Sequence, residues 1–576
     1  MNRRWFINRT NQEYINYLSK VSSLTPPVVQ VLINRGLKTL NDISEFLNPR
    51  LSNISDPFEL YGINTAVERI KDAMRRNERI LIHGDYDADG LVSTAIMVHA
   101  LRLLGLDVHY FIPNRGLHGY GFNFTGLQRA IELGAKLIIT VDCGITSFET
   151  VSLSKKEGID VIITDHHEPL IGLPDEEFLP PQAGLPDAIA VINPKIPNFK
   201  SGAGQISNLS GAGVAFKLVQ ALSMIQDSGF EVQEFLDLTA IGTIADAVPL
   251  IGENRVLVKE GLRFIENGTR PGLDALKKVA GINVKELKSG LLSFTIIPRI
   301  NAAGRVSDAN DVVKLLLTDS HDEAIKISSW LDKLNSERQK REEEIYQEAI
   351  FGLNSKGVRS AIVLSSEGWH PGIIGIVASR IAETFYRPTF IISLEGKSAR
   401  GSARSIPPFN IYRGLAGCRE FLTDFGGHRQ AAGFRLNAEN IPSFEEKINM
   451  IVSETLTEND LTPTVEIDAD VNLSHINFKL INEFNMLEPL GPGNPEPLLG
   501  SKGLEVYYPR IVGSNHLKMK LRQQSCSIDA IGFDMAGLIE VLGESKRIDA
   551  VFTPFINEWE GTKQLQLNLK AIRTSL

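Results

Sequence analysis

The sequence predicts an α/β fold, in which a parallel-sheet domain is joined by a long helix to a smaller α/β domain and is followed by a small C-terminal β-barrel. Three observations support this prediction. Short runs rich in β-branched residues alternate with helical stretches in two regions, a proline-free helical stretch separates these regions, and short alternating strands fill the C-terminal part. A chain of 576 residues is too long for a single hydrophobic core, so we expect about three to five domains.

The bulk composition excludes several classes of protein. Apolar residues make up 43% and charged residues 22%, which is typical of a soluble globular protein. We find neither a signal peptide nor an apolar run of about 18 residues, so we expect a cytoplasmic protein without membrane contact. Three widely separated cysteines form no disulfide framework. The net charge of −9 argues weakly against a nucleic-acid partner, although a local basic groove is compatible with it.

The first two segments lead up to the long helix. Residues 1–60 are expected to form short helical pieces, and residues 61–319 the parallel-sheet domain. Within this domain, runs that are apolar on both faces predict buried parallel strands. These runs are 79–85, 136–144, 160–167 and 188–194. Residues 211–265 are predicted to be mostly helical.

The remaining three segments follow from the same patterns. Residues 320–353 hold helical character without proline, and predict one long helix between two globular units. Residues 354–458 form the second α/β domain. Residues 459–576 are rich in short alternating strands separated by turn residues, which favours an OB-like barrel.

Acidic and imidazole side chains follow three of the predicted strands. The stretch "LIHGDYDADG" (81–90) ends the first strand, "VDCG" (141–144) the second and "TDHH" (164–167) the third. A calcium-binding EF-hand loop is excluded, because its twelfth position would be Ile96 instead of a bidentate glutamate.

Carboxyl ends of parallel strands meet at one edge of a sheet, where ligands bind. A lone aspartate there is most simply a helix cap. Three such endings on one edge are better explained by cations that neutralise crowded carboxylates. Mixed Asp and His ligands suit Mn²⁺ or Mg²⁺, and a pair of ions suits hydrolysis of a phosphodiester or phosphoanhydride. Asp246, in "IADAVPL", is a further candidate ligand.

The order of these motifs carries a family resemblance. "HGDYDADG", "VDCG", "TDHH" and "IADAVPL" resemble the four motifs of the DHH phosphoesterase superfamily, and "GGHRQAAGF" (426–434) resembles the hallmark of its DHH-associated domain. Together with "PRINAAGR", "GWHPGIIGIVASR", "GSARS" and "GPGNPEP", they resemble the RecJ family of single-strand-specific DNA exonucleases over nearly the whole chain. The resemblance implies a DHH-type catalytic domain in residues 61–319 and a DHH-associated domain in residues 354–458.

The resemblance also implies roles for individual residues. One of two divalent ions would be held by His83, Asp85 and Asp142, and the other by Asp87, Asp142, His166 and Asp246. Asp89 and Asp165 would orient ligands or cap helices. His167 would lie near the scissile phosphate, so that Asp142, His166 and His167 form the expected catalytic set, although support of the metal ligands is the alternative for His167.

Substrate contacts are expected from several motifs. The residues in question are Arg299, Asn301, Arg305, His370, Ser402, Arg404, Gly426, Gly427 and His428. Arginine suits bidentate phosphate recognition, and adjacent glycines let backbone amides approach a phosphate oxygen. The alternative for "PRINAAGR" is a tight turn whose arginines pair with surface acids, and for His370 it is a structural role. Lys518, Lys520 and Arg522 would line a groove of the barrel or form its solvated face.

The implied activity is 5′→3′ hydrolysis of single-stranded DNA to 5′-mononucleotides in DNA repair and recombination. We expect a monomer that binds single-stranded DNA, with a single-strand-binding protein and a RecQ-type helicase as further family-implied partners. Another DHH phosphoesterase, such as an oligoribonuclease or a cyclic-dinucleotide phosphodiesterase, is one alternative. An inactive RecJ-like strand-binding scaffold is the other, and would be expected to lack metal ligands.

Overall fold

A computed structural model describes residues 3–114, 121–170, 184–196, 206–225, 229–268, 270–284, 286–544, 547–559 and 561–575. The chain forms two compact units. The first comprises Met1–Trp5, Arg305–Ser307 and Trp330–Val465. The second comprises Phe6–Gly304, Asp308–Ser329 and Glu466–Leu576. The boundaries between the five segments expected from the sequence stay a prediction.

The N-terminal segment is helical, as predicted. It contains α1 (Gln12–Ser22), α2 (Pro26–Asn34) and α3 (Leu40–Leu47). The start of α3 is fixed by a capping box, in which the Thr39 side chain accepts from the Asp42 amide and the Asp42 side chain from the Thr39 amide. A short strand that the sequence did not predict, β1 (Arg4–Ile7), pairs with β12 (Thr464–Ile467).

The second unit contains a parallel sheet of five strands in the order β3-β2-β4-β5-β6. Its strands are β2 (Ile80–His83), β3 (Val108–Phe111), β4 (Leu137–Val141), β5 (Asp160–Thr164) and β6 (Ala190–Ile192). Four of them match the predicted runs. The fifth, β3, was missed because it is an edge strand, is only half-buried beyond its first residue, and reads "VHYF" instead of a fully apolar run.

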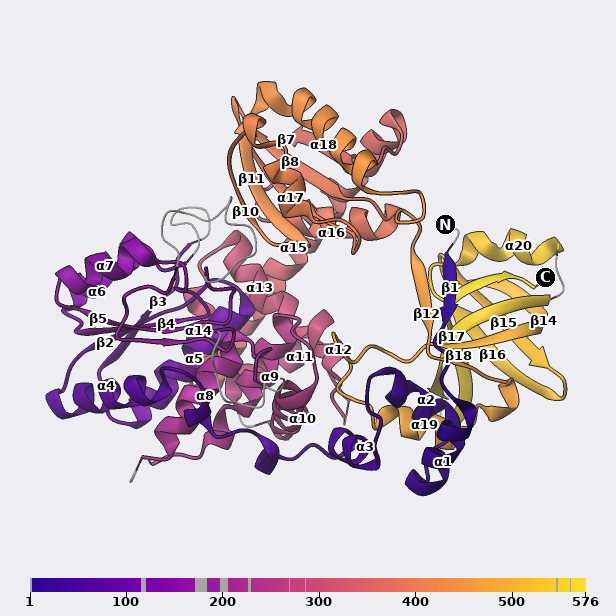
Figure 1. Cartoon of the computed structure of the whole chain (residues 1–576), viewed down its shortest axis with the longest axis horizontal. Helices are drawn as coiled ribbons and strands as arrows, with labels where there is room; N and C mark the ends of the chain where they lie inside the picture. The colour runs from indigo at the N-terminus through magenta and orange to yellow at the C-terminus, as the bar shows by residue number, and fades with distance from the viewer. Residues whose placement is uncertain are drawn as a thin grey trace. The chain divides into compact units, whose positions relative to one another are not determined.

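Helices cover both faces of this sheet (Figure 1). On one face lie α6 (Phe124–Leu133) and α7 (Phe148–Lys156), whose Leu127 and Val151 pack with Leu81 and Ile138 of the sheet. The other face is covered by three helices, α4 (Ile63–Arg76), α5 (Ala88–Leu103) and α8 (Gly211–Ser223). Helix α5 is buried around nearly its whole circumference because it lies between the sheet and further helices.

Further helices complete this part of the second unit. They are α9 (Leu236–Ala245), α10 (Gly252–Asn267), α11 (Pro271–Val279), α12 (Ser289–Phe294), α13 (Ile296–Val306) and α14 (Asn310–Leu317). Because "PRINAAGR" lies inside α13, the alternative of a tight turn is wrong. The small residues of this motif serve close packing, since a Cβ on Gly304 would clash with the Tyr86 carbonyl oxygen.

Helix α15 (His321–Lys356) is the predicted long helix, and leads into the α/β part of the first unit. The sheet there has the order β10-β11-β9-β8-β7, with only the β7–β8 pair parallel. Its elements are β7 (Ile362–Glu367), α16 (Ile374–Phe385), β8 (Thr389–Glu395), β9 (Ser398–Arg404), α17 (Ile411–Ala416), β10 (Leu422–Gly427), β11 (Ala431–Asn437) and α18 (Ile441–Thr455). Packed rings of Phe390, Phe434 and Phe444 fill the core beneath it.

The C-terminal strands close a barrel. After β13 (Ala469–Asp470) and α19 (Phe478–Asn485) come β14 (Leu499–Val512), β15 (His516–Gln523), β16 (Cys526–Gly532), α20 (Ile539–Glu544), β17 (Arg547–Trp559) and β18 (Thr562–Thr574). Pairing runs β14-β15-β16-β18-β17 and returns from β17 to β14. Closure pairs both edges of every strand in this five-stranded ring, and confirms the predicted OB-like barrel. Across the described residues, no helix combines the length and apolar character needed to cross a membrane.

A buried arginine ties three parts of the second unit together. Arg255 of α10 is 1% exposed, and its guanidinium lies 3.9 Å from the centre of the Phe46 ring. Its donors reach the carbonyl of Phe46 and four consecutive carbonyls, those of residues 486–489, directly after α19. A cation at this position stabilises the C-terminal end of a helix. One side chain therefore joins the N-terminal segment, α10 and the approach to the barrel.

Replacing this arginine should destabilise the protein strongly. In Arg255→Ala several buried carbonyls lose their donors and a cavity forms, so we expect the free energy of unfolding to fall by about 3 kcal/mol or more. Arg263→Ala, on the same helix but 60% exposed, should change it by less than about 0.5 kcal/mol. Urea denaturation of both variants measures the difference, and equal midpoints would contradict the role given to Arg255.

Candidate metal centre

The predicted ligands lie where the strands of the parallel sheet end. His83 is the last residue of β2, and Asp87 caps α5 by accepting from the Gly90 amide at 3.1 Å. Asp142 follows β4 and His166 follows β5. Asp246 comes from outside the sheet, at the C-terminal end of α9. Parallel strands place their carboxyl ends together, and this brings residues distant in sequence to one edge.

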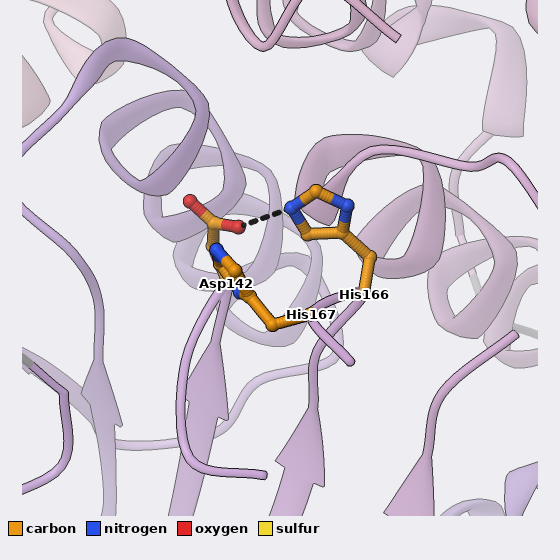
Figure 2. A group of neighbouring side chains, drawn as sticks. All are labelled: Asp142, His166 and His167. Atoms are coloured by element: carbon orange, nitrogen blue, oxygen red, sulfur yellow. Dashed lines mark ion pairs between the residues drawn. The ribbon is translucent and has the colours of Figure 1, made fainter. Parts of the chain in front are cut away.

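Potential ligand atoms at this edge form three overlapping groups. In each group all atoms lie within 4.8 Å of one another: Asp85, Asp87 and Asp142; Asp142, His166 and His167; and Asp89, His166 and Asp246. Figure 2 shows His166 and His167 beside Asp142, with the His166 Nε2 atom 3.2 Å from Asp142 Oδ1. Asp246 Oδ2 lies 3.5 Å from the same nitrogen. The structure thus brings together five of the six predicted metal ligands.

His83 is the sixth predicted ligand and lies in none of the three groups. Its ring is fully buried between Phe111 and Phe122, and its Nδ1 faces the Cys143 sulfur at 3.7 Å. Within the described residues, its Nε2 forms no hydrogen bond. Burial lowers the pKa of His83 to about 4, so the ring is neutral near pH 7. A neutral imidazole with a bare nitrogen is the form that binds a metal.

Two more buried ligand atoms lack a hydrogen bond of acceptable geometry in the described part of the chain. These are Asp142 Oδ1 and His166 Nε2, and each belongs to a predicted ligand. A buried polar atom without a partner is costly, and native structures rarely tolerate one without a reason. Divalent cations would satisfy these atoms, so the residues present fit the ions that the sequence predicts.

The carboxylates at the centre oppose one another electrostatically. Burial, together with the charges of Asp89, Asp87 and further aspartates, raises the pKa of Asp142 well above its usual value. Burial also raises the pKa of Asp246 to about 7, with Asp87 as the largest charged contributor. Such raised values mean that the charged forms are unfavourable without a compensating cation.

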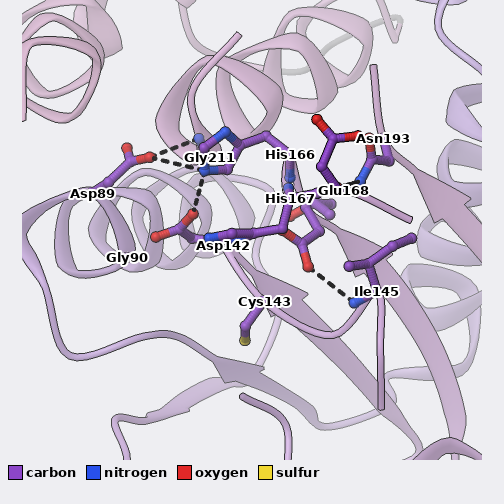
Figure 3. Close-up of polar contacts among 12 residues, drawn as sticks. Asp89, Gly90, Asp142, Cys143, Ile145, His166, His167, Glu168, Asn193 and Gly211 are labelled. Atoms are coloured by element: carbon purple, nitrogen blue, oxygen red, sulfur yellow. Dashed lines mark hydrogen bonds and ion pairs between the residues drawn. The ribbon is translucent and has the colours of Figure 1, made fainter. Parts of the chain in front are cut away.

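Asp89 and Asp165 support the ligands, and Figure 3 shows Asp89 beside Gly211 and His166. Asp89 accepts from the amides of Gly211 and Ala212 at 2.7 and 2.9 Å, at the start of α8. Asp165 accepts from the His166 amide at 2.7 Å and from the Ile145 amide at 2.9 Å. Both residues therefore cap or orient their neighbours, as expected. Asp89 also lies 4.0 Å from His166 Nε2, closer to the centre than the sequence suggested.

His167 is held by Asp165. Its Nδ1 lies 2.7 Å from Asp165 Oδ1. Although burial alone would lower the pKa of His167, the bond to Asp165 raises it to about 9. In Asp165, burial opposes ionisation, but the bonds and charge from His167 bring the pKa to about 2. His167 is therefore cationic near pH 7, and its side chain is 32% exposed. Both properties suit a group that contacts an anion.

Glycines make room for the ligands, and sequence reasoning missed this role. Asp142 itself adopts a left-handed φ of 59°, which aspartate tolerates. A Cβ on Gly211 would lie 2.5 Å from Asp142 Oδ1, and one on Gly126 would lie 2.6 Å from His83 Nε2. Both glycines stand in the first turn of a helix, where a single sequence offers no signal that a side chain would collide with a distant strand end.

In the second unit, α13 supports the aspartate loop. The Asn301 side chain accepts from the Ala88 amide at 2.9 Å, at the start of α5. The Arg299 guanidinium donates to the carbonyl oxygen of Thr295, the residue directly before α13, at 2.8 Å. The sequence pointed to substrate contacts for both residues, and that role stays a prediction. The bond from Ala88 gives Asn301 a structural contact that fixes the loop carrying Asp85 and Asp87.

The remaining predicted substrate residues belong to the first unit. Arg305 donates to the Gly372 carbonyl oxygen at 3.2 Å, and His370 Nδ1 accepts from the Gly372 amide at 3.1 Å. Arg404 donates to the hydroxyls of Ser379 and Ser402 at 3.1 and 3.3 Å. These contacts gather His370, Ser402 and Arg404 around α16 and β9.

The glycine pair of this unit ends β10. Gly427 has a φ of 141°, and its Cβ would lie 2.5 Å from the Ala431 carbonyl oxygen. Gly426 has open space where a Cβ would stand, and the His428 amide donates to that same Ala431 oxygen at 2.8 Å. Gly427 is therefore required by the hairpin itself, whereas the structure gives Gly426 no such reason.

Metal binding should release protons. Because Asp246 has a pKa of about 7, it is mostly protonated below that pH and must lose its proton to bind a cation. We expect the apparent Mn²⁺ affinity to fall by about tenfold per pH unit and per released proton below pH ~7, and to level off above it. Calorimetric titrations near pH ~6 and ~8 measure this change. Asp246→Asn should make the dependence shallower, and an affinity independent of pH would contradict the raised pKa values.

Family models match three parts of the chain. One described as the DHH family, N-terminal domain, matches residues 79–243. One described as the DHHA1 domain matches residues 358–454, and one described as the RecJ OB domain matches residues 467–571. The three matches cover the parallel sheet, the mixed sheet of the first unit and the barrel.

Curated relatives match most of this chain in sequence. The single-stranded-DNA-specific exonuclease RecJ of Bacillus subtilis is 39% identical over 572 residues, which are 98% of this chain and 70% of that protein. The exonuclease of the same name from Haemophilus influenzae is 35% identical over 545 residues, 90% of this chain and 92% of that protein.

Two solved structures share the fold. RecJ from Thermus thermophilus in complex with Mn²⁺ matches with a TM-score of 0.84 and 30% identity, over 100% of this chain and 80% of that one. A structure described as exonuclease RecJ bound to manganese matches with a TM-score of 0.58 and 36% identity, over 70% of this chain and 98% of that one.

Proposed function

Because this chain belongs to the RecJ family, we propose that it is a metal-dependent exonuclease that degrades single-stranded DNA from the 5′ end and releases 5′-mononucleotides. The observation that carries the proposal is the cluster of Asp85, Asp87, Asp142, His166 and Asp246, whose atoms lie within ligand distance at one sheet edge. No predicted ligand is missing from the chain, and this argues against an inactive strand-binding scaffold.

Two divalent ions, Mn²⁺ or Mg²⁺, are proposed at this edge. His83, Asp85 and Asp142 would hold one, and Asp87, Asp142, His166 and Asp246 the other. When bound, such ions supply Lewis-acid polarisation of the phosphate and lower the pKa of water. The Mn²⁺ and Mg²⁺ complexes of Thermus RecJ support the choice of metals, and the shared position of Asp142 in two ligand groups supports a bridging role.

The chain's own residues would prepare the phosphate. His167, held by Asp165, presents a cation beside the ligand cluster and is proposed to contact a non-bridging oxygen of the scissile phosphate. Asp165 fixes the orientation of both histidines through the bonds that it accepts from their amides. Asp142 and His166 are proposed as the catalytic ligands, since each belongs to two of the three groups of potential ligand atoms.

Substrate recognition is proposed to use arginines and backbone amides. Arg404, with the hydroxyl of Ser402 beside it, is suited to a phosphate because guanidinium and hydroxyl donors converge there. Open space above Gly426 is compatible with close approach of a DNA backbone. The further proposed contacts are Arg299, Asn301, Arg305, His370, Gly427 and His428.

The barrel offers a second kind of contact. Strand β14 has a bulge, because Tyr508 and Pro509 stand opposite Met519 alone. Tyr508 has a φ of 52°, a strained value for an aromatic residue, and its side chain is 77% exposed. Lys518 and Lys520 lie on the neighbouring strand. An exposed ring beside cationic side chains favours stacking of unpaired bases over the alternative of a plain solvated face.

The setting of this activity follows from its substrate. Single-stranded DNA arises in cytoplasmic DNA repair and recombination, where a single-strand-binding protein and a RecQ-type helicase would act beside a monomeric nuclease. These partners and the monomeric state are family expectations carried forward as part of the proposal.

Replacing Asp142, which belongs to two of the ligand groups, should abolish catalysis without abolishing the binding of single-stranded DNA. In Asp142→Asn the bridging carboxylate becomes an amide, and we expect kcat on 5′-labelled single-stranded DNA to fall by about a thousandfold or more. Asp187→Asn, a substitution of a 77% exposed aspartate, serves as the matched control and should leave kcat unchanged. Retention of activity in Asp142→Asn would refute the proposed centre.

The range of substrates that the protein hydrolyses distinguishes a single-strand-specific exonuclease from another DHH phosphoesterase. Release of labelled mononucleotide from the 5′ end of a long single strand is expected with Mn²⁺ or Mg²⁺ present. Faster hydrolysis of dinucleotides or cyclic dinucleotides than of long strands would favour another DHH phosphoesterase. Release from a 3′ label first would contradict the proposed polarity.

The exposed tyrosine should contribute to strand affinity. Loss of one stacked base costs about 1–3 kcal/mol, so Tyr508→Ala should weaken binding of single-stranded DNA by about 5–150-fold. Phe351→Ala, which removes an equally exposed ring from α15, is the control. Fluorescence anisotropy with a labelled oligonucleotide and inactive Asp142→Asn protein measures both, and equal dissociation constants would exclude stacking on Tyr508.

A further inference from the structure

The stretch "GPGN", residues 491–494, forms a tight turn that none of the proposed metal or DNA contacts explains. The Gly491 amide donates to the Asn494 carbonyl oxygen at 2.9 Å, and the Asn494 amide donates to the Gly491 carbonyl oxygen at 3.0 Å. Pro492 occupies the second position of the turn, and Gly493 occupies the third with a φ of 72°. These features define a type II β-turn, which needs a positive φ at its third residue.

Buried hydrogen bonds hold this turn in place. Asn494 is fully buried, and its side-chain amide donates to the carbonyls of Leu487 and Pro489 at 2.8 and 2.7 Å. Its side-chain oxygen accepts from Arg35 of the N-terminal segment. Arg255 reaches the Leu487 and Pro489 carbonyls as well. Several hydrogen bonds to one buried side chain favour a single conformation, so the turn presents a fixed surface.

That surface meets the segment directly after Asp246. The Leu250 amide donates to the Pro492 carbonyl oxygen at 2.7 Å. A Cβ on Gly493 would lie 3.0 Å from Pro249 Cβ, and one on Gly491 would lie 2.8 Å from Leu250 Cδ1. Both glycines of the turn are thus needed for close approach, and Gly493 is also needed for its backbone conformation.

Asp246 is joined directly to this segment. It ends α9, where its own amide still donates to the Gly242 carbonyl oxygen at 3.0 Å. The chain then turns through Ala247, which has a left-handed φ of 56°, and the Leu250 amide makes the bond to the 491–494 turn three residues later. The Asp246 side chain is 28% exposed, unlike Asp142 at 3%, so side-chain packing constrains it less.

We infer that the 491–494 turn is a positioning element for Asp246, and that it sets the affinity of the ion that Asp246 helps to hold. The inference rests on the proposed function, because it takes Asp246 as a metal ligand. The turn leads within a few residues into β14, the first strand of the barrel. The approach to the barrel therefore contributes to the metal centre without supplying a ligand.

Metal binding tests the inference. In Gly493→Ala the left-handed position becomes strained and the new methyl group presses on Pro249, so the Pro492 carbonyl should leave the Leu250 amide. Residues that support metal ligands contribute about 10–100-fold to affinity, so we expect the Mn²⁺ dissociation constant of the ion at Asp246 to rise by about tenfold and that of the other ion to stay unchanged. Raising the Mn²⁺ concentration should restore kcat, and KM for single-stranded DNA should stay unchanged. Isothermal titration calorimetry and Mn²⁺ electron paramagnetic resonance give the constants without relying on activity.

Gly503→Ala is the matched control. Gly503 also has a positive φ, 64°, but a Cβ there would meet nothing within 4 Å. Both variants carry similar backbone strain. A loss of Mn²⁺ affinity in Gly493→Ala alone therefore supports the positioning of Asp246 by the 491–494 turn. Equal Mn²⁺ affinities in the two variants overturn the inference. If Gly493→Ala does not fold, Gly491→Ala carries the same test through its contact with Leu250, with wild-type affinity as the overturning result. Wild-type protein that binds no Mn²⁺ would instead refute the proposed function.

Discussion

Mutual repulsion among closely spaced carboxylates is the constraint on which this structure depends. Asp85, Asp87, Asp142 and Asp246 converge on one sheet edge, where burial and like charge raise the pKa of Asp142 and Asp246. A fold gains no stability from such crowding by itself, because charged groups lose hydration on burial. The arrangement is understandable as a site whose free energy is completed by divalent cations, and the bare nitrogens of His83 and His166 agree with that interpretation.

The supports around this centre come from many parts of the chain. Asp165 and Asp89 fix histidines and a helix start, Asn301 caps α5, and Gly126 and Gly211 leave the space that the ligands occupy. The 491–494 turn, braced by Arg255, meets the segment after Asp246. Carboxylates that repel one another need such rigid surroundings, because their own interactions cannot hold them in place.

Tertiary structure revised several expectations for physical reasons. The "PRINAAGR" motif forms a helix instead of a turn, since its small residues allow α13 to approach the Tyr86 carbonyl. Strand β3 escaped detection because an edge strand needs no fully apolar sequence. Asp89 lies nearer to the ligands than a capping residue requires, whereas the expected role of His83 as a metal ligand stays a prediction.

The sequence by itself determined the alternation of strands and helices, the long helix, the barrel and the residue types at each strand end. These features are local, because periodicity, strand length and the position of an aspartate after an apolar run can be read within a short window. Only the tertiary structure decided which atoms share a site. The distance between His166 and Asp246, the room left by Gly211 and the bond from Leu250 to Pro492 depend on packing between segments far apart in the chain, and no local pattern encodes such distances.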